Sequence, residues 1–452
     1  MSTAFVRTAF APAEPAPPAT TSGFGRFLLS LFATPLNIVM TAMSVGIIAL
    51  VVPALVRFLV LDATWTGTGR ADCLPNAGAC WPFIWAKLGQ FTYGFYPVAE
   101  RWRPNLVFML GATLLLPLLI PSARYKRLNS LLFFGVYPVV AFVLLTGGNL
   151  DLRAFLLGRI INWQTIAGFG SDLGLRWTFW SDFFLSAVLL TGIAALIAVL
   201  MRSSVRTAAS AMALLFAALG LILLAMDLDF GLRPVETRLW GGILVTMVVA
   251  VTGIVVSLPL GILLALGRRS RLPVIRLLSV IFIEFWRGVP VITVLFFATY
   301  MLPLFLPRGV SFDTFLRVLV GVALFSAAYM AEVVRGGLQS IPRGQYEAAE
   351  ALGLGYWRVM AFVVLPQALT LTIPGIVNNF IGLFKDTTLV LIVAIFDLLG
   401  QIRAAFSDPN WATPVTLYTG FAFAGMFYFV CCFAMSRYAL FVERRTRVPG
   451  SI

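Results

Sequence analysis

The chain has 452 residues, of which 60% are hydrophobic and only 12% are charged, and its formal net charge is +14. A soluble domain carries about twice this charged fraction, which excludes a soluble globular protein, and the basic residues lie in short loops instead of one patch, which excludes nucleic-acid binding. Histidine is absent, which removes the commonest metal ligand and general base, so we expect no metal site and no catalytic residue.

Long apolar runs recur along the chain, and each is close to the ~20 residues that a helix needs to cross a bilayer. The runs are continuous and not alternating, which favours helices over a β-barrel. We therefore predict an all-α integral membrane protein with about ten transmembrane helices. The predicted spans are residues 37–61, 104–120, 131–147, 181–201, 207–226, 241–267, 277–306, 315–335, 369–396 and 415–440.

Residues 1–36 are predicted to be a disordered cytoplasmic tail, because their central stretch APAEPAPPATTS cannot bury a core. Basic residues concentrate in short loops after alternate spans, and the positive-inside rule places such loops in the cytoplasm. Both termini are then cytoplasmic, which requires an even number of spans. The deciding residues are Arg124, Lys126, Arg127, Arg202, Arg206, Arg268, Arg269, Arg271, Arg276, Arg437, Arg444, Arg445 and Arg447.

Two loops are predicted to lie outside the cytoplasm. Cys73 and Cys80 flank a small polar loop, and we predict a structural disulfide between them because that compartment permits one. The loop at 148–180 carries Trp163, Trp177 and Trp180. These aromatic residues are expected at the headgroup level, and docking of a soluble partner is the alternative.

The spans change in character near residue 236. Earlier spans hold almost no charge, whereas later ones contain Glu284, Arg287, Glu332, Lys385 and Asp386. Ionisable groups at membrane depth are costly and mark either a pathway or a pair. We therefore predict that the tail is followed by an accessory membrane extension at 37–235, with long outer loops, and by a working core at 236–448.

The stretch 340–368 reads SIPRGQYEAAEALGLGYWRVMAFVVLPQA and fits neither a membrane span nor a simple connecting loop. Pro342 suits the first turn of a helix, where its missing N–H is not needed. Gly353 and Gly355 should break that helix, so we predict a helix, a bend and a second helix. Such an element lies on the membrane face and presents a compact surface to the cytosol.

The spacing within this stretch is specific. Glu347-Ala348-Ala349 is followed by Gly353 and then by Val363, Leu365 and Pro366. This resembles the EAA motif of ABC-importer permeases, with Val363 where that family often has Ile. Other runs resemble HisM/GlnP-like permeases of polar-amino-acid importers, and the enlarged N-terminal half is most similar to BztC/AapM-like permeases. These runs are EFWRGVP at 284–290, AYMAE at 328–332, RGG at 335–337 and KDTTL at 385–389.

The resemblance implies a five-span ABC type I importer permease core in the bacterial inner membrane, with an N-terminal multi-span extension. It implies that polar amino acids are carried, namely glutamate, glutamine, aspartate and asparagine or L-amino acids generally. The partners that it implies are two ATP-binding subunits, a second permease that is a different but homologous chain, a periplasmic amino-acid-binding protein and the lipid bilayer. The residues implied in ATPase coupling are Glu347, Ala348, Ala349, Gly353, Leu365 and Pro366.

The sequence contains no phosphate loop of the form G-x-x-x-x-G-K-[ST], so ATP must be hydrolysed by another polypeptide. We therefore expect no cofactor on this chain, with ATP and Mg²⁺ on the partner ATPase subunits. The chain is predicted to transmit motion and not to act as an enzyme.

An amino-acid cargo needs one partner for its ammonium group and one for its carboxylate. Glu284 or Asp386 could serve the ammonium, with hydrogen bonds from Thr387 and Thr388, and Asn378 could line the same cavity. Arg287, or backbone N–H groups at a broken helix end, could serve the carboxylate. The alternative is structural: Glu284 and Arg287 pair at i,i+3, and Lys385 and Asp386 are buried partners across helices.

Three other functions were weighed against an ABC permease. An ion-coupled secondary amino-acid transporter needs no docking helix and is expected to show paired repeats, which we do not find. A membrane-embedded enzyme needs an acid–base cluster, and an ion channel needs a filter run or a ring of charges. Neither feature is found in the sequence.

Overall fold

The computed structural model describes residues 23–75, 77–120, 122–148, 175–200, 205–305 and 313–446. These residues form helices, turns and isolated bridges, and the described ranges contain no β-strand, which confirms the all-α prediction. The chain divides into two compact units, residues 1–81 and residues 82–452. Each unit is treated separately below.

The first unit is built on one long apolar helix. Its elements are α1 (Gly23–Leu31), α2 (Pro35–Val56), the π-helical turn η1 (Arg57–Leu61) and α3 (Arg70–Cys73). Thr34 caps α2 by accepting a hydrogen bond from the backbone N–H of Asn37. The last part of the predicted 1–36 tail is therefore helical, because α1 and the start of α2 lie within it, while residues 1–22 lie outside the described ranges.

A disulfide joins Cys73 and Cys80, whose Cα atoms are 5.6 Å apart. Both cysteines are buried. The N–H of Thr64 donates to the carbonyl of Ala79 over 2.8 Å and closes the same loop, and the Trp81 indole donates to the carbonyl of Leu59 over 2.9 Å. Several hydrogen bonds therefore hold the loop against the end of η1.

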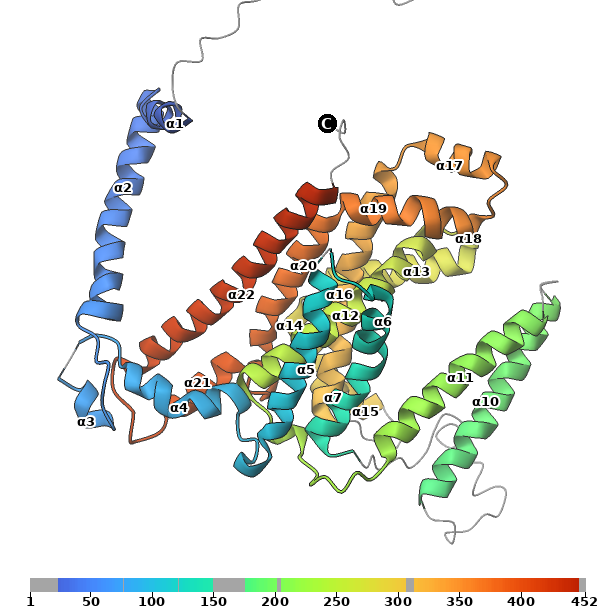
Figure 1. Cartoon of the computed structure of the whole chain (residues 1–452), viewed down its shortest axis with the longest axis horizontal. Coiled ribbons are helices and arrows are strands. Elements are labelled where there is room, and N and C mark those ends of the chain that lie inside the picture. Colours follow the sequence, from blue (N-terminus) through green and yellow to red (C-terminus); the bar gives the residue numbers. More distant parts are fainter. Residues whose placement is uncertain are drawn as a thin grey trace, which may run out of the picture. The chain divides into compact units, whose positions relative to one another are not determined.

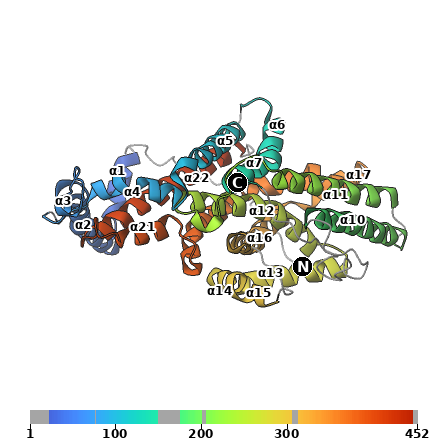
Figure 2. The same cartoon turned by 90° about the horizontal axis from the view of Figure 1, so that it is seen from below.

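The second unit begins with helices from the predicted extension. In chain order these are α4 (Trp81–Tyr93), η2 (Val98–Glu100), α5 (Trp102–Leu119), α6 (Lys126–Leu131), the π-helical η3 (Leu132–Val136), α7 (Tyr137–Thr146), α10 (Leu175–Leu200) and α11 (Val205–Asp227). Helices α10 and α11 lie side by side in both views (Figures 1 and 2). Phe179, Phe183 and Phe216 are buried between them. Trp180 belongs to α10 and packs on Phe183, whereas Trp163 and most of the predicted 148–180 loop lie outside the described residues.

The predicted core contains the most extensive helix contact, between α12 and α16. Small buried residues on α16, including Ala327, Ala328 and Ala331, allow this close approach. The elements of this part are η4 (Thr237–Leu239), α12 (Gly242–Arg268), α13 (Pro273–Gly288), α14 (Val291–Phe296), η5 (Phe297–Met301), α15 (Leu302–Phe305), α16 (Thr314–Ser340), α17 (Arg343–Ala351), α18 (Tyr356–Val359), η6 (Met360–Val364), α19 (Leu365–Leu371), α20 (Ile373–Asp386), η7 (Thr387–Val393), α21 (Leu398–Phe406) and α22 (Thr416–Thr446).

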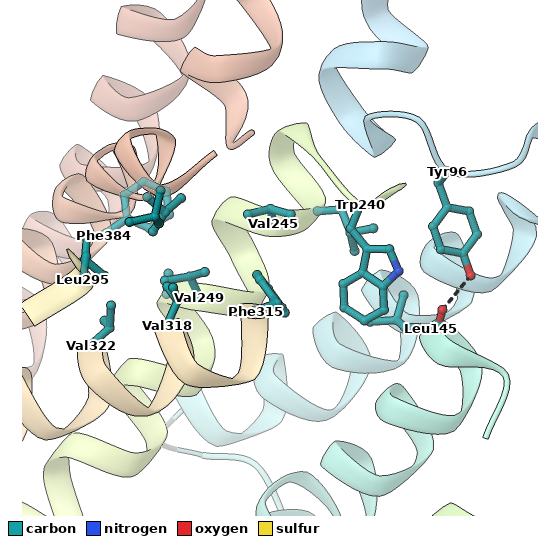
Figure 3. Close-up of a cluster of buried hydrophobic side chains, with 14 of the residues drawn as sticks. Tyr96, Leu145, Trp240, Val245, Val249, Leu295, Phe315, Val318, Val322 and Phe384 are labelled. Carbon is teal, nitrogen blue, oxygen red and sulfur yellow. Dashed lines mark hydrogen bonds between the residues drawn. The ribbon is translucent and has the colours of Figure 1, made fainter. Parts of the chain in front are cut away.

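The predicted boundary at 235/236 is not a break in packing. Tyr96, Leu145 and Val235 share one buried cluster with Trp240 and residues of α12, α14, α16 and α20. Figure 3 shows this cluster, with the Tyr96 hydroxyl donating to the carbonyl of Leu145 over 3.0 Å. The later part of the extension is therefore integrated into the core, although the charge pattern of the sequence separates them.

Nine helices within the described ranges are long and apolar enough to cross a membrane, and a bent pair could supply a tenth span. This agrees with the predicted number. The expected continuous span at 277–306 is wrong, however, because α13 and the α14–α15 segment meet at 104°. The break falls at Val289-Pro290, where proline lacks the N–H that would continue the helix and restricts the preceding residue.

The end of α4 approaches the start of α12 backbone to backbone. Gly242 has φ +65°, and a Cβ there would lie 2.0 Å from the Phe91 carbonyl oxygen. Gln90 donates to Gln401 over 3.1 Å, and Lys87 pairs with Asp408 beyond α21. Hydrogen bonding by Lys87 holds the pKa of the Asp408 carboxyl below its ordinary value. These contacts fix α4 across the ends of α12 and α21.

We predict that Gly242→Ala destabilises the protein more than Gly231→Ala. Both glycines have positive φ, +65° and +67°, but a Cβ at Gly231 meets nothing within 4 Å. Gly231→Ala should cost about 1 kcal/mol for backbone strain, whereas Gly242→Ala adds an overpacking cost of about 1–3 kcal/mol. The thermal midpoint of the detergent-solubilised protein measures both. Equal midpoints for the two variants would contradict the close approach.

Candidate functional site

The stretch 340–368 forms the predicted helix, bend and helix at one end of the helical bundle (Figure 1). Helix α16 ends at Ser340, and Pro342 occupies the N-cap of α17. After the bend, α18 continues through the π-helical η6 into α19. A short amphipathic helix is thereby joined to the candidate span α16 on one side and to the shorter apolar helix Tyr356–Leu371 on the other.

Gly353 ends α17 in a left-handed conformation, with φ +74°. Its N–H donates to the carbonyl of Glu350 over 2.9 Å, and the N–H of Leu354 donates to the carbonyl of Ala349 over 3.3 Å. This is the Schellman pattern, which strongly favours glycine. A Cβ at Gly353 meets nothing within 4 Å, so the backbone conformation, and not crowding within this chain, requires glycine here.

The residues predicted for coupling divide between two faces. Glu347, Ala348 and Pro366 are exposed and Leu365 is half-buried. Ala349 is only 3% exposed, in a cluster with Leu338 and Val359. Ala349 therefore lies on the inner face of α17, because the periodicity of the helix turns that residue toward Leu338 and Val359.

Large apolar side chains on both sides of the bend are exposed and were missed by sequence reasoning. Leu352 is 80% exposed and Trp357 is 71% exposed. They flank Gly353-Leu354-Gly355, and an apolar residue on each side of a glycine bend was the available signal. Exposed apolar side chains beside acidic residues are typical of a protein contact surface.

Helix α17 is anchored through Tyr346 and Gln345. Arg269, at the end of α12, donates to the Tyr346 hydroxyl and to the carbonyl of Leu338, each over 3.1 Å, and its guanidinium lies 5.7 Å from the Tyr346 ring centre. Gln367 on α19 donates to Gln345 over 3.1 Å. The surface helix is thus bonded to α12, α16 and α19.

A cluster of charges joins α12, α13 and α16 beside this anchor. Arg268 bonds Glu284 over 2.8 Å and Glu332 over 3.0 Å. Glu332 also accepts from Arg335 over 2.8 Å and lies 3.7 Å from Arg287. Glu284 and Arg287 therefore do not form the i,i+3 pair considered above; each is bound to a residue of another helix.

The remaining pathway candidates lie on α20 and in the first turn of η7. Asn378 and Lys385 are exposed, and their seven-residue spacing places them on one face of the helix. Thr387 is buried and donates to the carbonyl of Phe384, and Thr388 donates to the carbonyl of Lys385. Asp386 is half-buried, and no hydrogen bond or ion pair joins its carboxylate to another described residue.

The structure separates the pathway candidates into two groups. Val333, next to Glu332, lies 3.0 Å from the Cβ position of Gly375 near the start of α20. Asp386 is further along the same helix by about 16 Å of axial rise. Glu284 and Arg287 therefore belong to the charged cluster near α17, and Asp386 and Thr388 lie toward the opposite end.

Asp397 is a buried carboxyl that sequence reasoning missed. It lies beyond the last turn of the span Ile373–Val393 and caps α21 by accepting from the N–H of Gly400 over 2.9 Å. The Tyr428 hydroxyl donates to its other oxygen over 3.2 Å. Burial raises the pKa of the Asp397 carboxyl to about 6. The sequence did contain a signal for this cap, because an Asp directly before an apolar helical run is a common N-cap residue.

This architecture defines the membrane-spanning subunit of a transporter. Residues 257–448 match the family model described as "Binding-protein-dependent transport system inner membrane component". The chain is 40% identical to the inner membrane amino-acid ABC transporter permease protein YhdY of Escherichia coli (strain K12), over 92% of this chain and 91% of that protein. It therefore belongs to the family of amino-acid ABC transporter permeases, and the alternative of an ion-coupled secondary transporter is not upheld.

Two further relatives bear on the extension. The glutamate/glutamine/aspartate/asparagine transport system permease protein BztC of Rhodobacter capsulatus is 40% identical over 98% of each chain. The probable glutamine ABC transporter permease protein GlnP of Bacillus subtilis is 32% identical, over 93% of its own length but only 46% of this chain. Nearly a whole GlnP thus aligns with less than half of this chain, whereas the match to BztC runs along the whole of both.

We predict that Glu332→Gln destabilises the protein by about 2 kcal/mol, because it removes the charge that joins three arginines. Glu284→Gln is the matched control: its side chain is 54% exposed against 16% for Glu332, and an exposed pair contributes less than about 1 kcal/mol. The thermal midpoint of each solubilised variant gives the comparison. An effect at Glu284 as large as that at Glu332 would contradict the central place of Glu332.

Proposed function

We propose that this permease imports glutamate, glutamine, aspartate and asparagine, and that its α17–α18 surface receives force from separate ATPase subunits. The observation that carries the coupling role is the exposed α17, bonded through Tyr346 to Arg269 and to the carbonyl of Leu338. Similarity to BztC along the full length of both chains supports the choice of cargo.

ATP and Mg²⁺ belong on the partner subunits in this proposal, since the sequence has no phosphate loop. Closure of the ATPases moves α17, and the bonds to Arg269 and Gln367 carry that motion to α12 and α19. The exposed Glu347, Ala348, Leu352 and Trp357 form the docking surface. The whole transporter then contains two ATP-binding subunits and a second, homologous permease.

The orientation of the chain in the membrane follows from the α17–α18 docking surface. Docking to ATPases places α17 in the cytoplasm, and basic residues near it, such as Arg268 and Arg269, agree with the positive-inside rule. Both termini are then cytoplasmic in a bacterial inner membrane, with ten spans. The end that carries α21 faces the periplasm and receives the amino-acid-binding protein.

The cargo pathway follows the polar face of α20. Asn378 and Lys385 are exposed in the single chain, and such groups are costly against lipid, so they face a cavity shared with the second permease. The α-helix ends at Asp386, where α20 gives way to η7. A carboxylate at the negative end of a helix dipole favours the ammonium group that all four amino acids share.

Coupling is tested by Gly353→Ala with Gly355→Ala as control. Neither added methyl meets another atom within 4 Å, and only Gly353 has positive φ. We expect Gly353→Ala to lower transport and substrate-stimulated ATP hydrolysis several-fold by distorting the bend, and Gly355→Ala to have little effect. The measurement uses the whole reconstituted transporter with its binding protein. Unchanged coupling in Gly353→Ala, and also in the bulkier Gly353→Asp, would remove this loop from the mechanism.

Asp386→Asn tests the pathway, with Thr388→Ala as control because that hydroxyl bonds only its own helix. Loss of one charged contact to the ammonium should raise the apparent KM about tenfold for all four amino acids. ATP hydrolysis without substrate should stay unchanged. Uptake kinetics in proteoliposomes provide the measurement, and wild-type kinetics for every amino acid would exclude Asp386 from the pathway.

A further inference from the structure

A groove of about 780 Å³ lies between the end of α5 and the α6–η3 segment. Its position is within the extension and remote in sequence from the coupling loop and from α20. It combines two cations and a hydroxyl with apolar walls. The lining residues are Leu118, Lys126, Arg127, Ser130, Leu131, Phe134 and Gly135.

The lining follows a gradient of polarity along one helix face. Lys126 and Arg127 come first, Ser130 and Leu131 lie one turn later, and Phe134 follows after another turn. The spacing i, i+4, i+8 keeps these residues on one face, and the whole stripe is about 12 Å long. The polar end begins at the first residue of the span Lys126–Thr146, so the stripe runs from the membrane surface inward.

The two cations carry uncompensated charge. Lys126 and Arg127 are exposed, and neither forms an ion pair or hydrogen bond with another residue in the described ranges. Further along the stripe, Phe134 is 52% exposed and Leu131 is 65% exposed. Gly135 has no neighbour within 4 Å of its Cβ position, so the inner part of the groove is open and apolar.

Contacts with α22 show near which end of that helix the groove lies. Tyr438, in the C-terminal part of α22, donates to the carbonyl of Leu119 over 2.9 Å at the end of α5. Tyr428, ten residues earlier on α22, bonds Asp397 near the opposite end. The groove therefore lies toward the C-terminal end of α22, away from Asp397.

We propose that this groove binds an anionic glycerophospholipid. The phosphate is held by Lys126 and Arg127, with Ser130 able to donate a hydrogen bond, and one acyl chain packs over Leu131 and Phe134. Charge complementarity selects an anionic headgroup. The polar-to-apolar gradient selects a molecule with an attached acyl chain over a free phosphate, because a soluble anion gains nothing from the open apolar end.

The test compares lipid retention by the whole transporter, purified in a mild detergent and incubated with equal amounts of phosphatidylglycerol and phosphatidylcholine. Bound lipids are identified by native mass spectrometry. The first variant, Lys126→Gln with Arg127→Gln, removes the charges. The second, Gly135→Leu, fills the apolar end where the structure has open space and leaves the charges in place. Arg124→Gln is the control, since Arg124 is exposed near the same turn but does not line the groove.

We expect the wild type and the control to retain phosphatidylglycerol over phosphatidylcholine, and both groove variants to lose roughly tenfold in this retention. Inorganic phosphate at equal concentration should not displace the lipid. Displacement by phosphate would assign the site to a soluble anion and overturn the proposal. Equal retention by the wild type and both groove variants, or an equal loss in Arg124→Gln, would also overturn it.

Discussion

The ion pairs of Glu332 hold together the end of the helical bundle that carries α17. Its carboxylate contacts arginines from the end of α12, from α13 and from its own helix α16. Charges near the membrane are costly unless they neutralise one another. The cost of separating them keeps the three helices in register, and the adjacent Arg269–Tyr346 bond places α17 on the same frame. The surface helix and the transmembrane bundle therefore form one mechanical unit at this end.

The opposite end of α20 presents the reverse situation. Lys385 is charged and exposed within a membrane-spanning helix, and the carboxylate of Asp386 bonds no other described residue. A single chain satisfies its charges at Glu332 but leaves these groups without partners. A second permease and an amino-acid cargo would supply what is missing. This difference between the two ends is the physical basis for the proposal that one end couples to the ATPases and the other passes the cargo.

The part of the extension that lies in the second unit packs into the core. Tyr96 and Leu145 pack into the cluster that contains Trp240 and Val318, and Gly242 allows α4 to contact the start of α12 closely. The similarity to BztC covers 98% of each chain and so includes the extension as well as the core. The α5–α6 turn, which carries the proposed lipid groove, offers one binding surface within the described part of this extension.

The sequence by itself determined the helical membrane class, the approximate number of spans, the bend at Gly353 and the family, because these depend on composition, run length and local spacing. Only the tertiary structure decided that Ala349 faces inward, that 277–306 bends by 104°, and that Glu284 and Arg287 bind partners on other helices. It also revealed Asp397 as a buried carboxyl. The partners of Glu284 and Arg287 and the burial of Ala349 and Asp397 depend on which helix faces pack together, and residues far apart in the chain set that packing.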